Sequence, residues 1–208
     1  HLEETLKSAL NTLAKVAPNW LERIVNGDWY DRYGQKDGYS RKTRTTEEKE
    51  AKAIEIGTDG FYLLDAIYHE TTPDAIRQIQ AVEVLRQVWL QQYYAPTEGT
   101  VQLRTEKDGP PNAIRIFSPH ETEARKSIKR STKWTGYKVH LTETCEEDLP
   151  HLITHVETTV ATTQDSTVLP SIHKALAEKE VLPQYHLVDM GYTSAQLIVS
   201  SQQEYDID

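Results

Sequence analysis

Two alternating stretches in the C-terminal half most constrain how this chain can fold. In residues 137–142 a tyrosine, a valine and a leucine alternate with polar residues, and residues 152–159 repeat the alternation. A period of two is typical of a strand that buries one face. The segment between them, residues 145–150, is short and acidic. The sequence therefore predicts an antiparallel hairpin.

A helix is expected after this hairpin. Apolar residues recur at helical spacing across residues 168–181. Asp165 or Ser166 can accept hydrogen bonds from the free amides of the first turn, which favours a structural role for Asp165 as a helix cap. Pro170 is compatible with a helix only in its first turn, so we expect the helix to begin close to this residue.

A short buried strand that ends in a carboxylate should come next. Residues 186–188 form an apolar run typical of a strand buried on both faces, and Asp189 follows directly. Thr193 and Gln196 have the spacing of a capping box and predict a further helix. Residues 206–208 have the pattern of another strand, which should pair in parallel because strand, helix and strand form a right-handed crossover. We therefore expect the sequence to end inside a domain.

The N-terminal half has the pattern of amphipathic helices. Pro18, Gly27 and Gly57 are expected to interrupt or end them. The apolar spacing predicts helical segments at residues 2–16, 20–25, 45–56, 61–68, from Pro73 onward, and 81–94. Four aromatic residues lie between the second and third segments, and we expect them to anchor the core rather than stack on bases: Trp29, Tyr30, Tyr33 and Tyr39.

A change in composition divides the chain. Residues 95–112 are rich in Pro, Gly, Thr and charged residues, which is typical of a loop or linker. The sequence therefore predicts a helical domain at residues 1–112 and a β-rich domain at residues 113–208. The fold class that follows is α/β in the broad sense (α+β), with helices and strands largely segregated along the chain.

The composition excludes several classes of protein. Hydrophobic residues make up 38% of the 208 positions, and no apolar run approaches the roughly 20 residues that span a bilayer. Cys145 is the one cysteine, so an internal disulfide framework is excluded and a reducing cytoplasm is expected. The first residues have neither the basic start nor the apolar centre of a signal peptide.

A local cationic run contrasts with the acidic chain around it. The formal net charge of -9 argues against general affinity for nucleic acid. Six basic residues nevertheless gather just before and within the predicted hairpin, namely Arg125, Lys126, Lys129, Arg130, Lys133 and Lys138. This run is either a solvated face or a place where a polyanion such as DNA docks through its phosphates.

Asp189 is the sharpest candidate for a catalytic residue. A carboxylate at the end of a buried strand lies at a sheet edge, where it can ligate a hard cation such as Mg²⁺. Asp165 and Glu121 are possible accessory acids, although the favoured interpretations are a helix cap for Asp165 and a solvated turn for Glu121. The sequence has no Gly-rich phosphate loop, no Gly-x-Ser-x-Gly elbow and no zinc-like His pair on a helix.

The chain resembles the DDE transposases of bacterial insertion sequences. The likeness extends through the helical half and is carried by a series of motifs in order: Ser118-Pro119, Glu123-Ala124-Arg125, Trp134-Thr135-Gly136-Tyr137-Lys138-Val139-His140-Leu141, His151-Leu152-Ile153-Thr154, Asp165, and His186-Leu187-Val188-Asp189-Met190-Gly191-Tyr192.

This resemblance implies an RNase H-like mixed sheet core with a large N-terminal helical insertion. In that family three acidic residues bind two divalent ions, Mg²⁺ or Mn²⁺, and the enzyme cuts the ends of the element and joins them to target DNA. Asp189 matches the second acid, while the first and third would lie before His1 and beyond Asp208. Glu121 and Met190 stand where the family often has Asp and Ala.

The resemblance thus predicts an internal, incomplete piece of a transposase that is inactive by itself. It implies DNA ends and target DNA as partners, a homodimer in the full-length protein, no membrane partner, and a location in the bacterial cytoplasm at the nucleoid. Two alternatives stay open. One is an inactive remnant whose helical block mediates self-association or DNA binding, and the other is a nuclease built on the same core.

Overall fold

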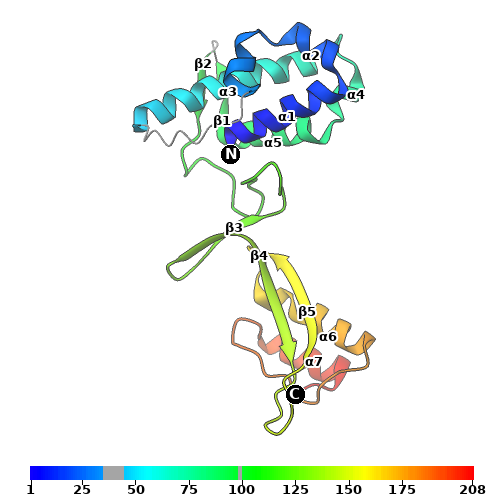
Figure 1. The fold of residues 1–208 in the computed structure, drawn as a ribbon. Coiled ribbons are helices and arrows are strands. Elements are labelled where there is room, and N and C mark those ends of the chain that lie inside the picture. The colour runs from blue at the N-terminus through cyan, green and yellow to red at the C-terminus, as the bar shows by residue number, and fades with distance from the viewer. Residues whose placement is uncertain (35–44, 98–99) are drawn as a thin grey trace. The chain divides into compact units, whose positions relative to one another are not determined.

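The structure, a computed structural model, describes residues 1–34, 45–97 and 100–208, and it divides the chain into two units (Figure 1). We call His1–Glu123 the helical unit and Ala124–Asp208 the sheet unit. Helices and small antiparallel sheets both occur, which confirms the predicted α+β class in this coarse sense. Among the described helices, none combines the length and the apolar character that a bilayer crossing requires.

The helical unit follows the predicted pattern closely. The first helix ends just before Pro18, which occupies the first turn of the second. Thr45 caps the third helix through a capping box with Glu48, as its sequence suggests. The helical elements of the described part are α1 (Leu2–Val16), α2 (Pro18–Ile24), the π-helical turn η1 (Tyr30–Gly34), α3 (Thr46–Tyr68), α4 (Asp74–Arg77) and α5 (Gln80–Gln92).

Gly57 does not end α3, contrary to the prediction from sequence. A Cβ atom at Gly57 would lie 2.5 Å from Tyr93 Cε1, and one at Gly60 would lie 2.1 Å from Trp89 Cε2. The indole nitrogen of Trp89 donates to the Gly57 carbonyl oxygen at 2.9 Å. The two glycines therefore allow large aromatic rings to approach the α3 backbone, and the helix continues through them because tertiary packing outweighs the propensity of glycine.

The core of the helical unit lies between α1, α3 and α5. Trp29 and Tyr33 are buried in it, which confirms their predicted anchoring role, but Tyr30 is exposed and that part of the prediction is wrong. Tyr39 lies outside the described residues. The core includes a contiguous set of fully buried side chains, among them Leu6, Leu13, Leu63, Ile67, Leu85, Val88 and Trp89.

The predicted loop at residues 95–112 contains a small sheet instead. Strand β1 (Tyr93–Thr97) pairs antiparallel with β2 (Thr100–Leu103), and Tyr93 opposes Leu103. Further along, the Gln91 side chain accepts a hydrogen bond from the Ile116 amide, and Ile116 is buried. These contacts attach the segment to α5, so the division between the units falls after Glu123 rather than at residue 112.

The sheet unit contains a three-stranded antiparallel sheet in the order β3-β4-β5. The predicted hairpin is confirmed, since Tyr137 pairs with Val160 and Leu141 with Val156. Strand β3, the first of this unit, was not predicted, because the sequence analysis interpreted its residues only as a run of charges. The elements of this unit are β3 (Arg125–Lys129), β4 (Thr132–Glu143), β5 (Ile153–Val160), the 3₁₀ turn η2 (Asp165–Thr167), α6 (Leu169–Glu178) and α7 (Ala195–Tyr205).

Strand β4 changes partner at Gly136. Its residues 132–136 pair with β3, whereas residues 137–143 pair with β5. Gly136 has φ +151°, a backbone conformation that side chains disfavour. The first part of β4 and β3 therefore form a two-stranded ribbon that extends past the end of β5, and we call residues 125–136 the β-ribbon.

The caps of the last two helices differ from those predicted. Pro170 lies in the first turn of α6 as expected, but Val168 precedes this helix and provides no side-chain cap. Neither Asp165 nor Ser166 caps α6, because both belong to the 3₁₀ turn before it. Helix α7 is capped by Ser194, whose hydroxyl accepts from the Leu197 amide, and not by Thr193.

Residues 186–188 form no strand of the described sheets, and the predicted buried strand is wrong as stated. The Leu187 side chain is 80% exposed. Two hydrogen bonds nevertheless join this segment to the C-terminus, from the His186 amide to the Asp208 carbonyl at 3.0 Å and from the Asp208 amide to the Gln184 carbonyl at 3.0 Å. This is the pattern of a parallel pair, so the expected parallel direction of residues 206–208 agrees with the structure.

Candidate functional site

A polar pocket in the sheet unit brings together several residues that the sequence singled out. The pocket has a volume of about 470 Å³ and lies where the β-ribbon meets the rest of the sheet. Its polar lining includes Lys138 and His140 from β4, Asp165 from η2, and Tyr192 from the loop before α7. We call this the polar pocket.

Asp165 forms an ion pair across the polar pocket. The Lys138 ammonium donates to Asp165 Oδ1 at 2.8 Å and to the Thr163 carbonyl oxygen at 2.6 Å. Both charged side chains are about one-quarter exposed. The carboxylate thus has a counter-ion, and Lys138, which was predicted to bind DNA, lies inside the polar pocket instead of on the outer part of the ribbon.

Asp189 lies close to the same pair, although not at the end of a buried strand. Its Oδ1 atom accepts a hydrogen bond from the Gly191 amide at 2.7 Å, and the residue is exposed. A Cβ atom on Gly191 would lie 2.9 Å from Asp189 Oδ1 and 3.4 Å from Asp165 Oδ2. The carboxylates of Asp165 and Asp189 therefore flank a space that is open because residue 191 has no side chain.

Tyr192 and His140 line the polar pocket and contact each other. Burial first, and then the charges of Asp165 and Asp189, raise the pKa of Tyr192, so its hydroxyl stays protonated at neutral pH. That hydroxyl contacts His140 Nδ1, while His140 Nε2 lies 3.0 Å from Thr159 Oγ1. Each ring nitrogen of His140 thus has a hydroxyl partner, Tyr192 at Nδ1 and Thr159 at Nε2. The contact with His140 connects Tyr192 to strand β4.

The donor set can be compared with what a divalent cation requires. Carboxylate oxygens suit Mg²⁺ and Mn²⁺, and the space beside Gly191 separates two of them. Within the described residues, however, no group of three or more His, Cys, Asp or Glu side chains is placed to hold a metal ion. Asp165 and Asp189 supply two carboxylates, so a cation held there would need further ligands from water or elsewhere.

Glu121 is part of a different unit from the residues of the polar pocket. It is exposed and lies in the helical unit, whereas Asp165 and Asp189 lie in the sheet unit. Its predicted role as an accessory acid stays a prediction.

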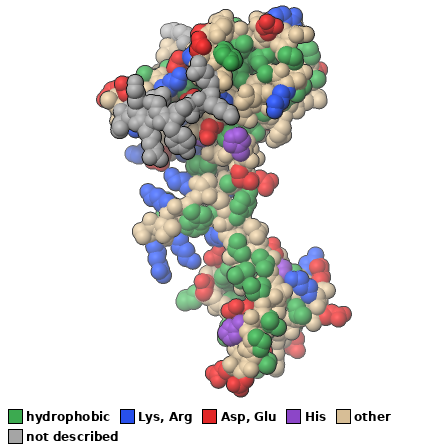
Figure 2. All heavy atoms as spheres, in the orientation of Figure 1, with side chains coloured by type: hydrophobic (Ala, Val, Ile, Leu, Met, Phe, Trp, Pro, Cys, Tyr) green, Lys and Arg blue, Asp and Glu red, His purple; other side chains and the backbone are tan. Residues whose placement is uncertain are grey.

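The remaining cations of the predicted DNA-binding group lie on the β-ribbon. Figure 2 shows blue Lys and Arg side chains gathered around it. Lys129 and Arg130 are exposed at its tip, where Arg130 adopts a left-handed backbone conformation with φ 56°. Lys133 is exposed on β4, and Arg125 and Lys126 are partly buried on β3. The structure thus brings five predicted DNA-binding residues together on one two-stranded element.

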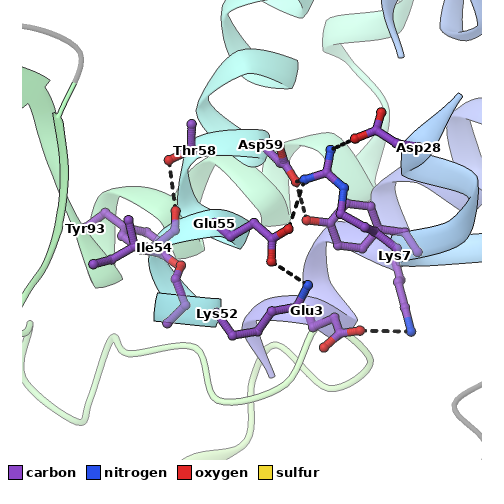
Figure 3. Close-up of polar contacts among 12 residues, drawn as sticks. Glu3, Lys7, Asp28, Lys52, Ile54, Glu55, Thr58, Asp59 and Tyr93 are labelled. Carbon is purple, nitrogen blue, oxygen red and sulfur yellow. Dashed lines mark hydrogen bonds and ion pairs between the residues drawn. The ribbon is translucent and has the colours of Figure 1, made fainter. Parts of the chain in front are cut away.

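The helical unit contains a second polar cluster, but its charges are already paired. Arg32 donates to Asp28, Glu55 and Asp59, and the shortest of these contacts, to Asp59, is 2.5 Å (Figure 3). Burial and the hydrogen bond to Asp59 raise the pKa of Tyr33. The cluster connects the η1 segment to α3, and we interpret it as structural because every carboxylate in it contacts the same guanidinium.

Two features of the polar pocket were not predicted. The Lys138–Asp165 ion pair and the His140–Tyr192 contact both join residues more than twenty positions apart. The alternation of β4 does place Lys138 and His140 on one face of the strand. That signal was present in the sequence, but it does not reveal which residues of the later loops face them. Comparisons with protein-family models, with curated proteins and with solved structures found no match to this chain.

Proposed function

We propose that this chain is an internal part of a DDE-type DNA transposase. The observation that carries the proposal is the meeting of Asp165 and Asp189 beside Gly191, in the same unit as a strongly cationic ribbon. Phosphodiester chemistry needs carboxylates that hold divalent ions and cations that hold the DNA backbone. The sheet unit combines both kinds of residue.

The finer fold proposed with this function is RNase H-like. It is supported by the antiparallel β4–β5 pair, by α6 after it, and by the parallel pairing of the segment before Asp189 with the residues after α7. The helical unit would then be an insertion that precedes the second core strand.

In this proposal Asp189 and Asp165 hold a Mg²⁺ or Mn²⁺ ion. Such an ion would stabilise negative charge on the oxygens of a phosphodiester. Lys138 neutralises Asp165 in the structure and would have to release it when a cation binds. Tyr192, which contacts His140, limits the space on one side of the polar pocket.

Titration with Mn²⁺ tests the site directly. We expect Asp189→Ala and Asp165→Ala each to weaken Mn²⁺ binding at least about tenfold, the loss of one charged ligand being worth roughly 1.4 kcal/mol or more. Lys138→Met should strengthen binding, because it removes the ammonium that competes for Asp165. Glu146→Ala, which changes a carboxylate in the exposed turn after β4, is the matched control.

If Asp189→Ala binds Mn²⁺ as well as the unmodified chain does, the metal assignment is wrong. In a longer chain that supplies the other two acids, Asp189→Ala should also abolish the joining of DNA ends. Product analysis there separates joining from the cutting that a nuclease on the same core would perform.

The alternative of an inactive self-association module receives less support. Exposed apolar stripes on residues 2–16 or 84–89 would favour it. Leu6, Leu13, Val84 and Trp89, which belong to those stripes, are instead buried in the core of the helical unit. Sedimentation that shows a stable dimer without affinity for DNA would restore this alternative.

A further inference from the structure

The β-ribbon has a geometry that a flat cationic patch does not have. Five residue pairs join β3 to the first part of β4, from Arg125 opposite Gly136 to Lys129 opposite Thr132. At the rise of a β-strand this paired length is about 17 Å. β5 pairs only with residues beyond Gly136, so over this length the ribbon has two strands.

The cations of the β-ribbon are divided between its two faces. Residues that oppose each other across an antiparallel pair share a face, and neighbours along a strand point to opposite faces. Arg125 and Lys129 therefore lie on one face, which also carries Trp134. Lys126 and Lys133 lie on the other face, together with Ile128. Each face thus presents two cations and one large apolar side chain.

No acidic residue interrupts this distribution. Residues 125–136 include five Lys and Arg residues and no Asp or Glu, whereas the whole chain has a formal charge of -9. The ribbon is therefore a local region of positive charge in an acidic chain, and it should attract an anionic partner to one place.

Cations on both faces indicate a partner with negative charge on two sides. A flat anionic surface, such as a membrane or an acidic protein, would contact one face and leave the other in water. The major groove of B-form DNA is about 12 Å wide, admits a two-stranded β-ribbon, and has a phosphate backbone along each side. Its dimensions and charge match those of the ribbon.

We infer that the β-ribbon enters the major groove of duplex DNA, with Arg125 and Lys129 facing one phosphate backbone and Lys126 and Lys133 facing the other. Arg130, at the turn, leads into the groove. This inference rests on the DNA-binding part of the proposed function and adds the mode of binding and the kind of duplex. It requires no particular base sequence, because phosphate contacts position a protein without specifying bases.

The division between faces can be tested with two matched double variants. Arg125→Gln with Lys129→Gln removes the cations of one face, and Lys126→Gln with Lys133→Gln removes those of the other. Binding to a 25-base-pair duplex would be followed by fluorescence anisotropy across a series of KCl concentrations. Each double variant should reduce the slope of log affinity against log salt by about 2, since each phosphate contact contributes about 0.9.

Two controls keep this result interpretable. Lys49→Gln with Lys107→Gln removes two exposed cations of the helical unit and should leave the slope unchanged. Hydrogen exchange of the amides in residues 137–143 and 153–160 should stay the same in both ribbon variants, which would show that the β4–β5 pair is intact.

A duplex RNA of equal length tests the groove itself. The major groove of A-form RNA is too deep and narrow for protein side chains, so we expect at least about tenfold weaker binding to RNA than to DNA. Equal affinity for the two duplexes, or a salt slope that depends on one face alone, would overturn the major-groove inference while leaving DNA binding in place. Absence of any affinity for DNA would instead refute the DNA-binding part of the proposed function.

Discussion

The helical unit and the sheet unit treat their apolar side chains differently. In the helical unit Trp89, Leu6 and Leu13 are fully buried among many apolar neighbours. In the sheet unit the corresponding cluster is small and consists of Val168, Ile172 and Leu176, with Tyr192 packed against it. Buried area is the main source of stability, so we expect the helical unit to be the more stable of the two.

The two faces of the β4–β5 pair show where the difference arises. His140 and His155 are buried on one face, where the side chain of Lys179, the residue after α6, contacts His155. On the opposite face Val139, Leu141 and Val156 are each more than half exposed. The comparison teaches that the ionisable side chains of the polar pocket lie in the unit with the smaller apolar core. The helical unit consists mainly of residues that pack against one another.

The largest expected effect tests the core of the helical unit. Trp89→Ala should lower its free energy of unfolding by about 3–5 kcal/mol, because it creates a cavity and removes the hydrogen bond to Gly57. The neighbouring Leu90→Ala, at a position that is 56% exposed, should change the free energy by less than about 0.5 kcal/mol. Denaturant melts of both variants would measure this. Similar losses in the two would contradict the described core.

The next largest effect is a pH dependence of stability that we expect in the sheet unit and not in the helical unit. Burial, followed by the neighbouring His186, lowers the pKa of His173 to about 4. His173 Nε2 lies 3.0 Å from His186 Nδ1, and its other nitrogen contacts the Ser201 hydroxyl at 3.3 Å. The Tyr205 ring packs against it, and Asp208 lines the same small cavity. This cluster joins α6, α7 and the segment before Asp189.

The direction of the effect follows from proton binding. Between the unfolded pKa of about 6.5 and the folded value near 4, the unfolded state binds more protons than the folded state, so stability falls as the pH falls through this range. The sheet unit should lose about 3 kcal/mol between pH 7 and pH 4, at 1.36 kcal/mol per pKa unit. Hydrogen exchange measured separately for the two units would detect this, and His173→Gln should remove most of the pH dependence. A sheet unit equally stable at both pH values would contradict it.

The smallest expected effect concerns the segment that was predicted as a buried strand. Leu187→Ala should change stability by less than about 0.5 kcal/mol, because this side chain is 80% exposed. Leu176→Ala, at a fully buried position of α6, should cost about 2–5 kcal/mol and serves as the matched comparison. A loss of 2 kcal/mol or more at Leu187 would show that residues 186–188 are buried after all.

Local patterns predicted much of the secondary structure. The alternation in residues 137–142 and 152–159 predicted the β4–β5 hairpin, and the leucine spacing before Pro18 predicted α1. These predictions succeeded because a period of two or of 3.6 residues is a property of the chain itself. Strand β3 was missed because Arg125–Lys129 has too few apolar residues for that pattern to appear.

Properties that depend on distant partners were not predictable in the same way. The sequence around Gly57 predicts a helix end, but α3 continues there because the ring of Tyr93, at the start of β1, packs against this glycine. Asp165 reads as a helix cap, yet its carboxylate accepts a hydrogen bond from Lys138 on another element. Residues 186–188 read as a buried strand because they are apolar, but burial also requires neighbouring strands on both sides. Sequence patterns singled out Lys138 and Asp165 as candidates, and only tertiary contacts show that they pair with each other.

Gly136 separates two properties of the β-ribbon that would otherwise be linked. With φ +151° and no atom within 4 Å of where its Cβ would lie, it is constrained by its own backbone and not by crowding. A side chain introduced there would strain the backbone where β4 changes partner, without altering any charge of the β-ribbon. The backbone conformation of the β-ribbon and its positive charge thus depend on different residues. Either can change while the other is preserved.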